Sequence, residues 1–384
     1  MRVLIINNYQ KSSLGGVESY LESLVSYSEN HYQEITFRWF GVENKKTKWY
    51  QKFYNASTTK AIIAEIDNFK PDLINSFSIG ATVTPHFMFY AKAKSIPVIH
   101  SFHDYYYICP KGYMLDTDEN TQYKKHNFIN CILKHHPKNS FFYDSLLNLK
   151  QSYHKAIIKK NIDYFLTPSE NLTQIIASEF NTPGETLPNP VIFSNPSLNT
   201  ENTDYLLFVG RIIEEKGILT LLKAFQKILK RHPNEQLKIV GSGNFQSTLE
   251  RYVLNNNIKN VAFLGPKGRE ELIEIYASAK FTIVPSEILE SYGNVVLESF
   301  AFNKTVIISN LVGIQKEVEA LNCGLIFPYG SVDKLEEAIE NLLINVHLRK
   351  ELEQNGTQYV KNLSIENHFK TLYNIYSKVL KNEF

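Results

Sequence analysis

The chain has 384 residues, which is enough for about two ordinary domains. Its 43% hydrophobic and 21% charged residues are typical of a soluble globular protein, and a formal net charge of +2 argues against a nucleic-acid-binding protein. Three cysteines are too few for a disulfide scaffold, and no apolar run reaches the roughly 20 residues of a membrane-spanning helix. We therefore expect a cytoplasmic protein whose membrane contacts are at most peripheral.

The first half of the chain alternates short apolar strands with helices. Residues 2–8 form an apolar run that predicts a strand buried on both faces, and the pair Gly15 and Gly16 separates it from an amphipathic helix. Ser169 is placed as the N-cap of a helix over residues 171–180. Further strands are expected at residues 71–78, 96–104 and 162–170. This order predicts a doubly wound α/β domain over residues 1–190.

A change of composition separates this domain from a second one. Residues 181–204 contain four prolines among many polar residues and are predicted to be a linker. The alternation of strands and helices then restarts, with strands expected at 205–211, 237–243, 261–266, 281–286, 305–310 and 324–328. A second doubly wound domain is therefore expected over residues 191–364. The two parallel sheets would face a central cleft, because such sheets bind ligands at the carboxyl ends of their strands.

The final predicted helix covers residues 365–382. Its apolar side chains fall on one face, which we expect to pack back on the first domain.

Polar residues follow the first strands of the second domain. Arg211 comes just past a strand and Lys216 five residues later, a pair that suits a diphosphate, with arginine as a forked donor and lysine as a point charge. Gly241, Gly243 and Gly265 end the next two strands, where glycine lets a base or a sugar approach the backbone. Solvated basic residues and ordinary strand-to-helix turns are the alternative interpretations.

The segment "ESYGNVVLE", residues 290–298, is predicted to run from a loop into a helix. Gly293 and Asn294 fall at the helix start, whose free N–H groups favour an anion such as a diphosphate. Glu290 would repel phosphate and therefore suits neutral sugar hydroxyls, whereas Glu298 is placed to accept hydrogen bonds from a ribose. Two surface glutamates without a ligand are the alternative.

Taken together, these motifs resemble glycosyltransferase family 4, whose members are retaining, metal-independent enzymes of the GT-B fold. The motifs are "GG", "HD" at His103 and Asp104, "FVGR" with "KG", "VGSG", "LGP" and the two glutamates eight residues apart. The resemblance implies that Arg211 and Lys216 neutralise the donor diphosphate. It also implies that Glu290 and His103 act at the transferred sugar and that Glu298 holds the ribose.

The resemblance further implies which residues line the two sides of the site. On the donor side these are Gly15, Gly16, Gly210, Gly241, Gly243, Gly265, Pro266, Ser291, Tyr292, Gly293, Asn294 and Val295. On the acceptor side they are Glu18 and Asp104.

The implied activity is transfer of a hexose or related sugar from a UDP- or GDP-sugar to a hydroxyl of a glycan or lipid-linked acceptor, without a cofactor. Assembly of a surface polysaccharide or lipopolysaccharide is the expected setting. A sugar-nucleotide 2-epimerase, which shares the fold, and a non-catalytic nucleotide-sugar-binding subunit are the alternatives.

Two other features bear on metal and membrane binding. Asp116 and Asp118 form the DxD pattern that binds a metal in the other glycosyltransferase fold, but no long apolar strand precedes them, so no metal site is predicted. Residues 121–160 hold eight lysines against one acid, and residues 45–54 are also basic and aromatic. Such stretches predict a peripheral contact with an anionic membrane at its inner face. The alternatives are a solvated loop or a helix packed on its own domain.

Overall fold

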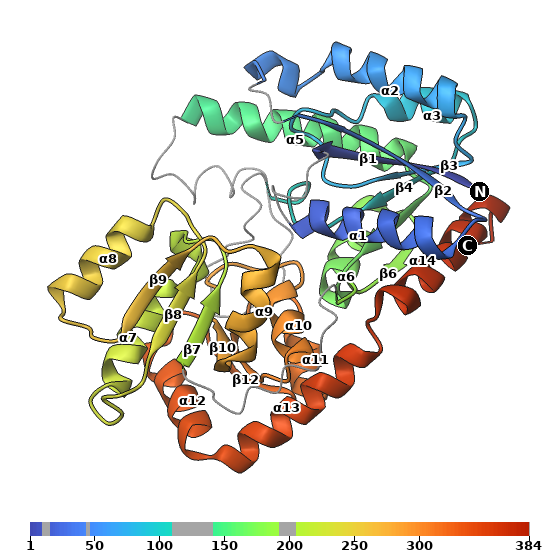
Figure 1. The fold of residues 1–384 in the computed structure, drawn as a ribbon. Coiled ribbons are helices and arrows are strands. Elements are labelled where there is room, and N and C mark those ends of the chain that lie inside the picture. Colours follow the sequence, from blue (N-terminus) through green and yellow to red (C-terminus); the bar gives the residue numbers. More distant parts are fainter. Residues whose placement is uncertain (10–15, 44–46, 110–140, 192–204, 384) are drawn as a thin grey trace. The chain divides into compact units, whose positions relative to one another are not determined.

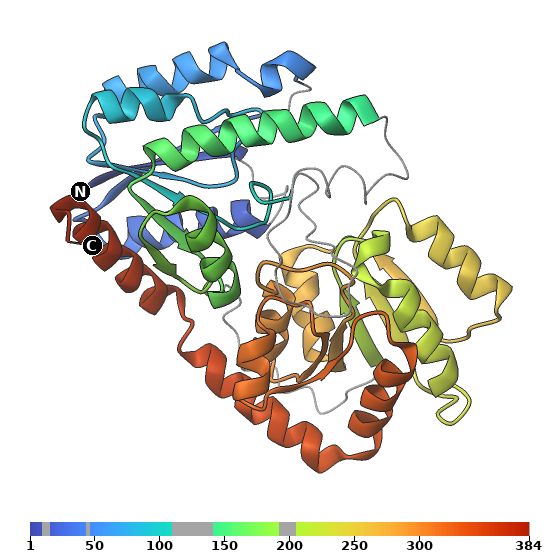
Figure 2. The same cartoon turned by 180° about the vertical axis from the view of Figure 1, so that it is seen from behind.

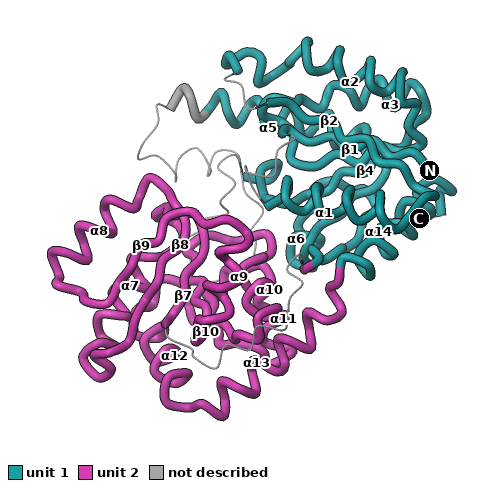
Figure 3. Tube along the Cα trace, in the orientation of Figure 1, with its two compact units in different colours: residues 1–190, 365–384 teal, residues 191–364 magenta. Residues whose placement is uncertain are grey.

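The computed structural model describes residues 1–9, 16–43, 47–109, 141–191 and 205–383. In the helix over residues 141–161, the side chains are described from residue 145 onward. The chain divides into two compact units (Figure 3). Unit 1 contains Met1–Pro190 and Ile365–Phe384, and unit 2 contains Val191–Ser364. No helix in these described ranges is long and apolar enough to cross a membrane. Gly15, Asp116, Asp118 and residues 121–140 lie outside the described residues.

Unit 1 is built on a fully parallel six-stranded sheet in the order β2-β1-β3-β4-β5-β6. The inner strands are almost completely buried, which explains their continuous apolar sequences. The edge strands β2 and β6 were not predicted, and β6 lies within the expected linker. The strands are β1 (Arg2–Tyr9), β2 (Thr36–Val42), β3 (Leu73–Ser76), β4 (Val98–Ser101), β5 (Tyr164–Thr167) and β6 (Gly184–Thr186).

Helices cover both faces of this sheet (Figures 1 and 2). One face carries α2 (Ala56–Phe69), α3 (Phe87–Ala93), α5 (Phe141–Asn161) and α6 (Glu170–Phe180), and the other carries α1 (Gly16–His31) and α14 (Ile365–Lys381). The Ser169 side chain accepts a hydrogen bond from the Leu172 backbone N–H, as predicted for the cap of α6. The short 3-10 helix η2 (Trp49–Lys52) precedes α2.

The helix α14 follows unit 2 in the chain but belongs to unit 1. It buries Phe369, Leu372, Ile375 and Tyr376 along one face and lies against α1.

Unit 2 also has a fully parallel six-stranded sheet, in the order β12-β11-β10-β7-β8-β9. Its strands are β7 (Tyr205–Val209), β8 (Leu237–Val240), β9 (Val261–Gly265), β10 (Ala279–Val284), β11 (Val306–Ser309) and β12 (Gly324–Phe327). Its helices are α7 (Ile218–Ile228), α8 (Gln246–Asn255), α9 (Arg269–Ala277), α10 (Asn294–Ala301), α11 (Gln315–Ala320), α12 (Val332–Ile344) and α13 (Val346–Lys361).

The core of unit 2 follows the two-residue period of its strands. Leu206 and Phe208 of β7 join the buried cluster formed with α7, α8 and α12. Tyr205 and Leu207, which alternate with them, pack with Tyr276 of α9 on the opposite face. Both faces of the sheet are therefore covered by helices, as expected for a doubly wound domain.

The order of strands reverses once in each sheet, between β1 and β3 in unit 1 and between β7 and β10 in unit 2. At such a switch point the connections leave in opposite directions and open a crevice at the carboxyl ends of the strands. The predicted class of two doubly wound α/β domains is confirmed. Each unit accordingly has its own place where a site is expected.

Candidate functional site

The switch point of unit 2 brings together Lys216 and Glu290. Lys216 ends the 3-10 helix η3 (Glu214–Lys216) after β7, and Glu290 lies in the loop after β10. The two loops are joined by a hydrogen bond from the Glu287 backbone N–H to the Glu215 carbonyl oxygen, 2.8 Å long. Lys216 Nζ lies 2.9 Å from Glu290 Oε1, and the side chains are only 18% and 14% exposed. Two residues predicted to bind different parts of one substrate thus form an ion pair with each other.

The Glu290 oxygen in this pair is incompletely satisfied. Oε1 is buried, and within the described part of the chain no hydrogen bond of good geometry reaches it. The contact with Lys216 is therefore a charge interaction that leaves this atom able to accept a directed hydrogen bond.

The loops after β7, β8 and β9 lie close together along the same edge. A Cβ atom on Gly241, whose φ is +134°, would collide with the carbonyl oxygen of Gly210. The Gly241 backbone N–H donates to the carbonyl oxygen of Gly265 at 2.9 Å. Glycine at position 241 is therefore required by the close approach of two backbones. Arg211, Gly243 and Pro266 are exposed beside these turns.

The start of α10 lies on the other side of the switch point. Gly293 is its N-cap with a φ of +131°, and Asn294 is exposed at the first helical position. The preceding loop is held from behind, because the Glu290 N–H donates to the Leu311 carbonyl oxygen at 2.8 Å. Ser291 and Val295 are partly buried. The Tyr292 side chain is buried in the core, so this residue could contact a sugar donor only through its backbone.

Glu298 lies on α10 and is half-buried. Its Oε2 accepts a hydrogen bond from the hydroxyl of Tyr276, at 2.6 Å. Burial raises the pKa of Glu298, and the hydrogen bond from Tyr276 lowers it. No sequence motif marks Tyr276, and the signal available for it is its position in the last turn of α9, just before a buried strand.

In unit 1, His103 follows β4 and lies among aromatic rings. Its ring stacks on that of Phe77 with a centroid distance of 5.7 Å, and the ring of Tyr20 lies 5.8 Å away. Desolvation and the nearby His368 lower the pKa of His103 to about 4, so its imidazole is neutral near pH 7.

Tyr20 is itself fixed by α14. His368 Nδ1 lies 2.8 Å from the Pro188 carbonyl oxygen, and His368 Nε2 lies 2.8 Å from the Tyr20 hydroxyl. A carbonyl oxygen only accepts, so Nδ1 carries the proton and Nε2 accepts from Tyr20. The pKa of His368, lowered by burial to about 4, agrees with a neutral ring. Helices α1 and α14 together therefore hold one of the rings that surround His103.

The two predicted acceptor-side carboxylates have protein partners. Asp104 Oδ1 accepts a hydrogen bond from the Tyr106 backbone N–H at 2.9 Å, which stabilises the loop after β4. Glu18 is buried on α1, and its Oε1 accepts from Asn7 Nδ2 at 2.7 Å. Gly16, the first residue of α1, is exposed.

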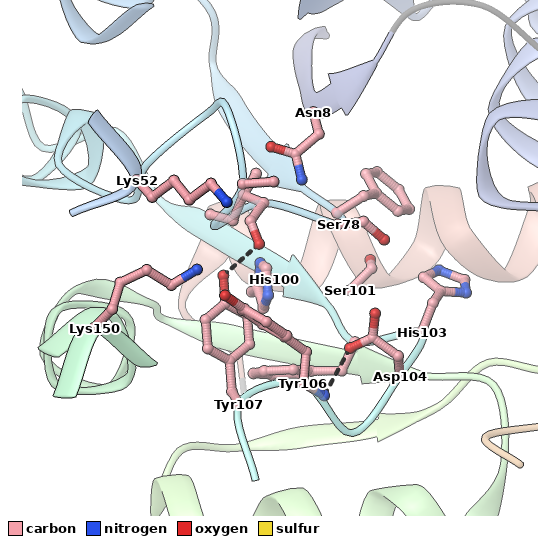
Figure 4. A pocket seen from close by; sticks show the side chains of 14 residues that line it. Asn8, Lys52, Ser78, His100, Ser101, His103, Asp104, Tyr106, Tyr107 and Lys150 are labelled. Carbon is pink, nitrogen blue, oxygen red and sulfur yellow. Dashed lines mark hydrogen bonds between the residues drawn. The ribbon is translucent and has the colours of Figure 1, made fainter. Parts of the chain in front are cut away.

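A cavity of about 260 Å³ lies at the carboxyl ends of β1, β3 and β4 (Figure 4). Asn8, Ser78 and Ser101 line it from these strand ends. In the close-up, Lys52 and Lys150 enter from one side, and His103 and Asp104 lie on the other. The two lysines are far from each other and from His103 in the sequence, so no local pattern connected them.

The basic stretch of the sequence contributes to this cavity. Within its described part, Lys150 and His154 of α5 are buried, and Lys155 Nζ pairs with Glu179 Oε2 at 2.8 Å. Residues 145–160 thus form a helix packed on its own unit, which was one of the two alternatives to a membrane surface. Among the described residues, no group of three or more histidine, cysteine, aspartate or glutamate side chains is placed to hold a metal ion.

Comparisons with known proteins agree with this architecture. Residues 192–359 match the family model described as "Glycosyl transferases group 1". An uncharacterized glycosyltransferase of Methanocaldococcus jannaschii is 26% identical over 393 residues, which cover 95% of each chain.

Two solved structures share the fold. WaaG, a glycosyltransferase involved in lipopolysaccharide biosynthesis, superposes with a TM-score of 0.68 at 15% identity and covers 98% of this chain and 99% of its own. HepE of Anabaena, in complex with UDP and glucose, gives a TM-score of 0.69 at 13% identity and covers 98% and 100%. The GT-B fold is thereby shown, and the class that the sequence matches support is a glycosyltransferase.

Proposed function

We propose that this protein is a retaining glycosyltransferase that moves a hexose or related sugar from a UDP- or GDP-sugar to a hydroxyl of a glycan or lipid-linked acceptor. The observation that carries the proposal is the meeting of Lys216 and Glu290 at the switch point of unit 2, beside the start of α10. This arrangement lies in the part of the chain that matches the group 1 glycosyltransferases.

The donor would be held by unit 2. Arg211 and Lys216 neutralise its diphosphate, together with the positive end of the helix dipole at the start of α10. Lys216 and Glu290 form an ion pair with each other, so an arriving phosphate takes Glu290's place at Lys216. Glu290, with one oxygen lacking a directed hydrogen bond, then accepts from hydroxyls of the sugar. Glu298 accepts from the ribose.

Gly241, Gly243 and Gly265 let the base approach the backbone, and Ser291 to Val295 surround the phosphates. HepE, which shares the fold, has been solved with UDP and glucose bound, and this supports a nucleotide-sugar donor.

The reaction would be a displacement at the anomeric carbon. The acceptor oxygen forms a bond to that carbon, the bond to the leaving phosphate oxygen breaks, and the electron pair leaves with the nucleoside diphosphate. The proton of the acceptor hydroxyl passes to a leaving phosphate oxygen, and the configuration is retained. Stabilising charge on the diphosphate is the main contribution to the rate. No metal or cofactor takes part.

Unit 1 would supply the acceptor side. A neutral His103 contacts the transferred sugar near its reacting carbon, and its neutrality follows from its lowered pKa. Glu18 and Asp104 shape the acceptor side from α1 and the loop after β4. WaaG, named for lipopolysaccharide biosynthesis, has the same fold, and this supports a setting in surface-polysaccharide or lipopolysaccharide assembly.

We also propose that the protein works in the cytoplasm, at the inner face of the membrane. The helix α5 exposes the large hydrophobic side chains of Leu149 and Tyr153, and its last turn exposes Lys159 and Lys160. Sedimentation with anionic vesicles at low salt tests this contact, and a protein that stays in the supernatant rules it out.

Thermal unfolding with UDP, GDP, ADP and their sugars tests the donor. A ligand that binds only the folded protein raises the melting temperature, and no increase with any nucleotide would refute the proposal. Glu298→Ala should mainly weaken donor binding, and Glu290→Ala and His103→Ala should mainly lower turnover. Glu319→Ala, at an exposed position of α11, is the control and should change neither. Release of free sugar from the donor separates an enzyme from a binding subunit.

A further inference from the structure

Two lysines line the cavity of unit 1, and neither is neutralised by an acidic residue of the described part of the chain. Lys52 and Lys150 both line it, and in the close-up both point into it from the same side (Figure 4). Within the described ranges of the chain, no carboxylate forms an ion pair with either lysine. Asp104 is the lining carboxylate, and it lies on the opposite side with His103.

Lys150 is unusual because its side chain is buried, with only 5% of the residue exposed. Its Nζ donates to the Gly80 carbonyl oxygen at 3.1 Å and lies 5.1 Å from the centroid of the Tyr106 ring. These contacts satisfy part of the hydrogen-bonding capacity of the ammonium, but neither contributes a negative charge.

Such an arrangement is costly without a counter-ion. Burial, together with the charge of Lys52, lowers the pKa of Lys150 to about 8, so the side chain still carries its charge at pH 7. Two protonated lysines in one cavity repel each other, and a buried charge without a partner is unfavourable. An anion between them would remove both penalties.

Two other polar side chains of the cavity wall, His100 and Tyr107, already have partners in the protein. His100 Nδ1 lies 2.8 Å from the Ser76 hydroxyl, and burial lowers its pKa to about 3. The Tyr107 hydroxyl donates to the Ile79 carbonyl oxygen at 2.7 Å. Positive charge for a ligand therefore comes from the two lysines, because the imidazoles of His100 and His103 are neutral.

We propose that this cavity binds an acidic group of the acceptor, a phosphate or a carboxylate, between Lys52 and Lys150. The acceptor is then an anionic sugar, with its acid held by the lysines and its reacting hydroxyl directed toward His103. Lysine suits this role because its ammonium binds phosphate or carboxylate as a point charge. The cavity of about 260 Å³ is smaller than most pockets for drug-sized ligands, so it takes one terminal unit of the acceptor. The inference rests on the proposed function, which places the reaction at His103.

Calorimetric titration of the full chain with four probes tests the proposal. The probes are glucose, inorganic phosphate, glucose 6-phosphate and glucuronic acid, at constant ionic strength. We expect phosphate or the two acidic sugars to bind and glucose to bind at least about 10-fold more weakly, as expected for loss of a hydrogen bond to a charged group. Comparison of glucose 6-phosphate with glucuronic acid shows which acid is preferred.

Lysine variants identify the place of binding. Lys52→Gln and Lys150→Gln should each weaken binding of the acidic probe about 10-fold or more, whereas Lys60→Gln, at an exposed position of α2, should not. Lys52 is only partly buried, so its variant keeps the test decisive if Lys150→Gln does not fold. Equal affinity for glucose and the acidic sugars, or unchanged binding by Lys52→Gln, would overturn the proposal.

Nucleotide binding by the same variants separates this inference from the proposed function. A UDP- or GDP-induced rise in melting temperature that survives in Lys52→Gln supports an acceptor role for the lysines. Loss of that rise would overturn it, because the lysines would then bind the donor. Nucleotide binding without any binding of acidic probes refutes the inference alone. If no nucleotide binds the wild type, the proposed function fails, and the acceptor role fails with it.

Discussion

Removing the hydroxyl of Tyr276 tests whether Glu298 is positioned for the donor by a neighbouring helix. Tyr276→Phe deletes the 2.6 Å hydrogen bond to Glu298 Oε2 and keeps the buried ring. A hydrogen bond to a charged acceptor contributes about 1.5–3 kcal/mol to stability. Taking about 2 kcal/mol, the melting temperature of a unit of this size should fall by about 4–8 °C.

The same variant should change donor binding. Glu298 loses the contact that fixes one oxygen, so we expect KM for the donor to rise about 3- to 10-fold with little change in kcat, which corresponds to about 0.7–1.4 kcal/mol. The hydrogen bond lowers the pKa of Glu298, so its removal raises that pKa. Since the ribose needs the ionised carboxylate as acceptor, the loss of donor affinity on acidification should begin at a higher pH in the variant.

Steady-state kinetics against donor concentration, repeated across pH, measures both effects. Tyr252→Phe on α8 is the matched control, because it removes a hydroxyl from a partly buried tyrosine of the same unit away from Glu298. An unchanged donor KM and an unchanged acid limb in Tyr276→Phe, with the expected fall in melting temperature, would show that the hydrogen bond is only structural.

Three further predictions follow from the geometry and the buried groups. Gly241→Ala should lower the stability of unit 2 by at least about 2 kcal/mol and reduce nucleotide binding, because the new Cβ collides with a backbone oxygen. Gly265→Ala should cost only about 1 kcal/mol, because its Cβ faces open space at a φ of +70°. Calorimetry with and without UDP compares the two variants. EDTA should leave transfer activity unchanged, and loss of activity that Mn²⁺ or Mg²⁺ restores would contradict the metal-free mechanism. Unit 1 should lose stability as the pH falls from about 6.5 to about 4, by up to about 5 kcal/mol per pH unit, because the unfolded chain takes up protons on four histidines that are neutral in the fold. The melting temperature against pH checks this, and a flat profile would contradict it. The four histidines, with pKa values lowered by burial, are His100, His103, His154 and His368.

The sequence was most informative where a segment is buried on both faces. The inner strands of both sheets and the cap at Ser169 were predicted because continuous apolar runs and capping residues are local signals. The strand β2 was missed because it lies at a sheet edge, where partly exposed residues break the apolar run. The strand β6 was missed because it has only three residues within a proline-rich segment, and its structure depends on pairing with β5.

The candidate site was less predictable because its key contacts join distant segments. The motifs identified Lys216 and Glu290 separately, but their ion pair requires β7 and β10 to be neighbours in the sheet. Lys150 was taken as part of a basic surface, since a lysine-rich helix gives no local indication of which side faces the core. A weak signal was present, because Lys150 and the buried His154 are four residues apart and so share one face of α5.

The return of α14 to unit 1 has a consequence for the time at which this unit can finish folding. The sheet of unit 1 is complete after β6, but two buried hydrogen bonds of the unit depend on α14. Asn75 of β3 donates to the Tyr376 hydroxyl, and the Tyr20 hydroxyl is hydrogen-bonded to His368. A ribosome adds about 5–20 residues per second, so synthesis of unit 2 delays these contacts by roughly 10–30 s. During that interval the surface that later receives Phe369, Leu372 and Ile375 stays uncovered. A nascent unit 1 therefore exposes an apolar surface until the segment beyond unit 2 has emerged.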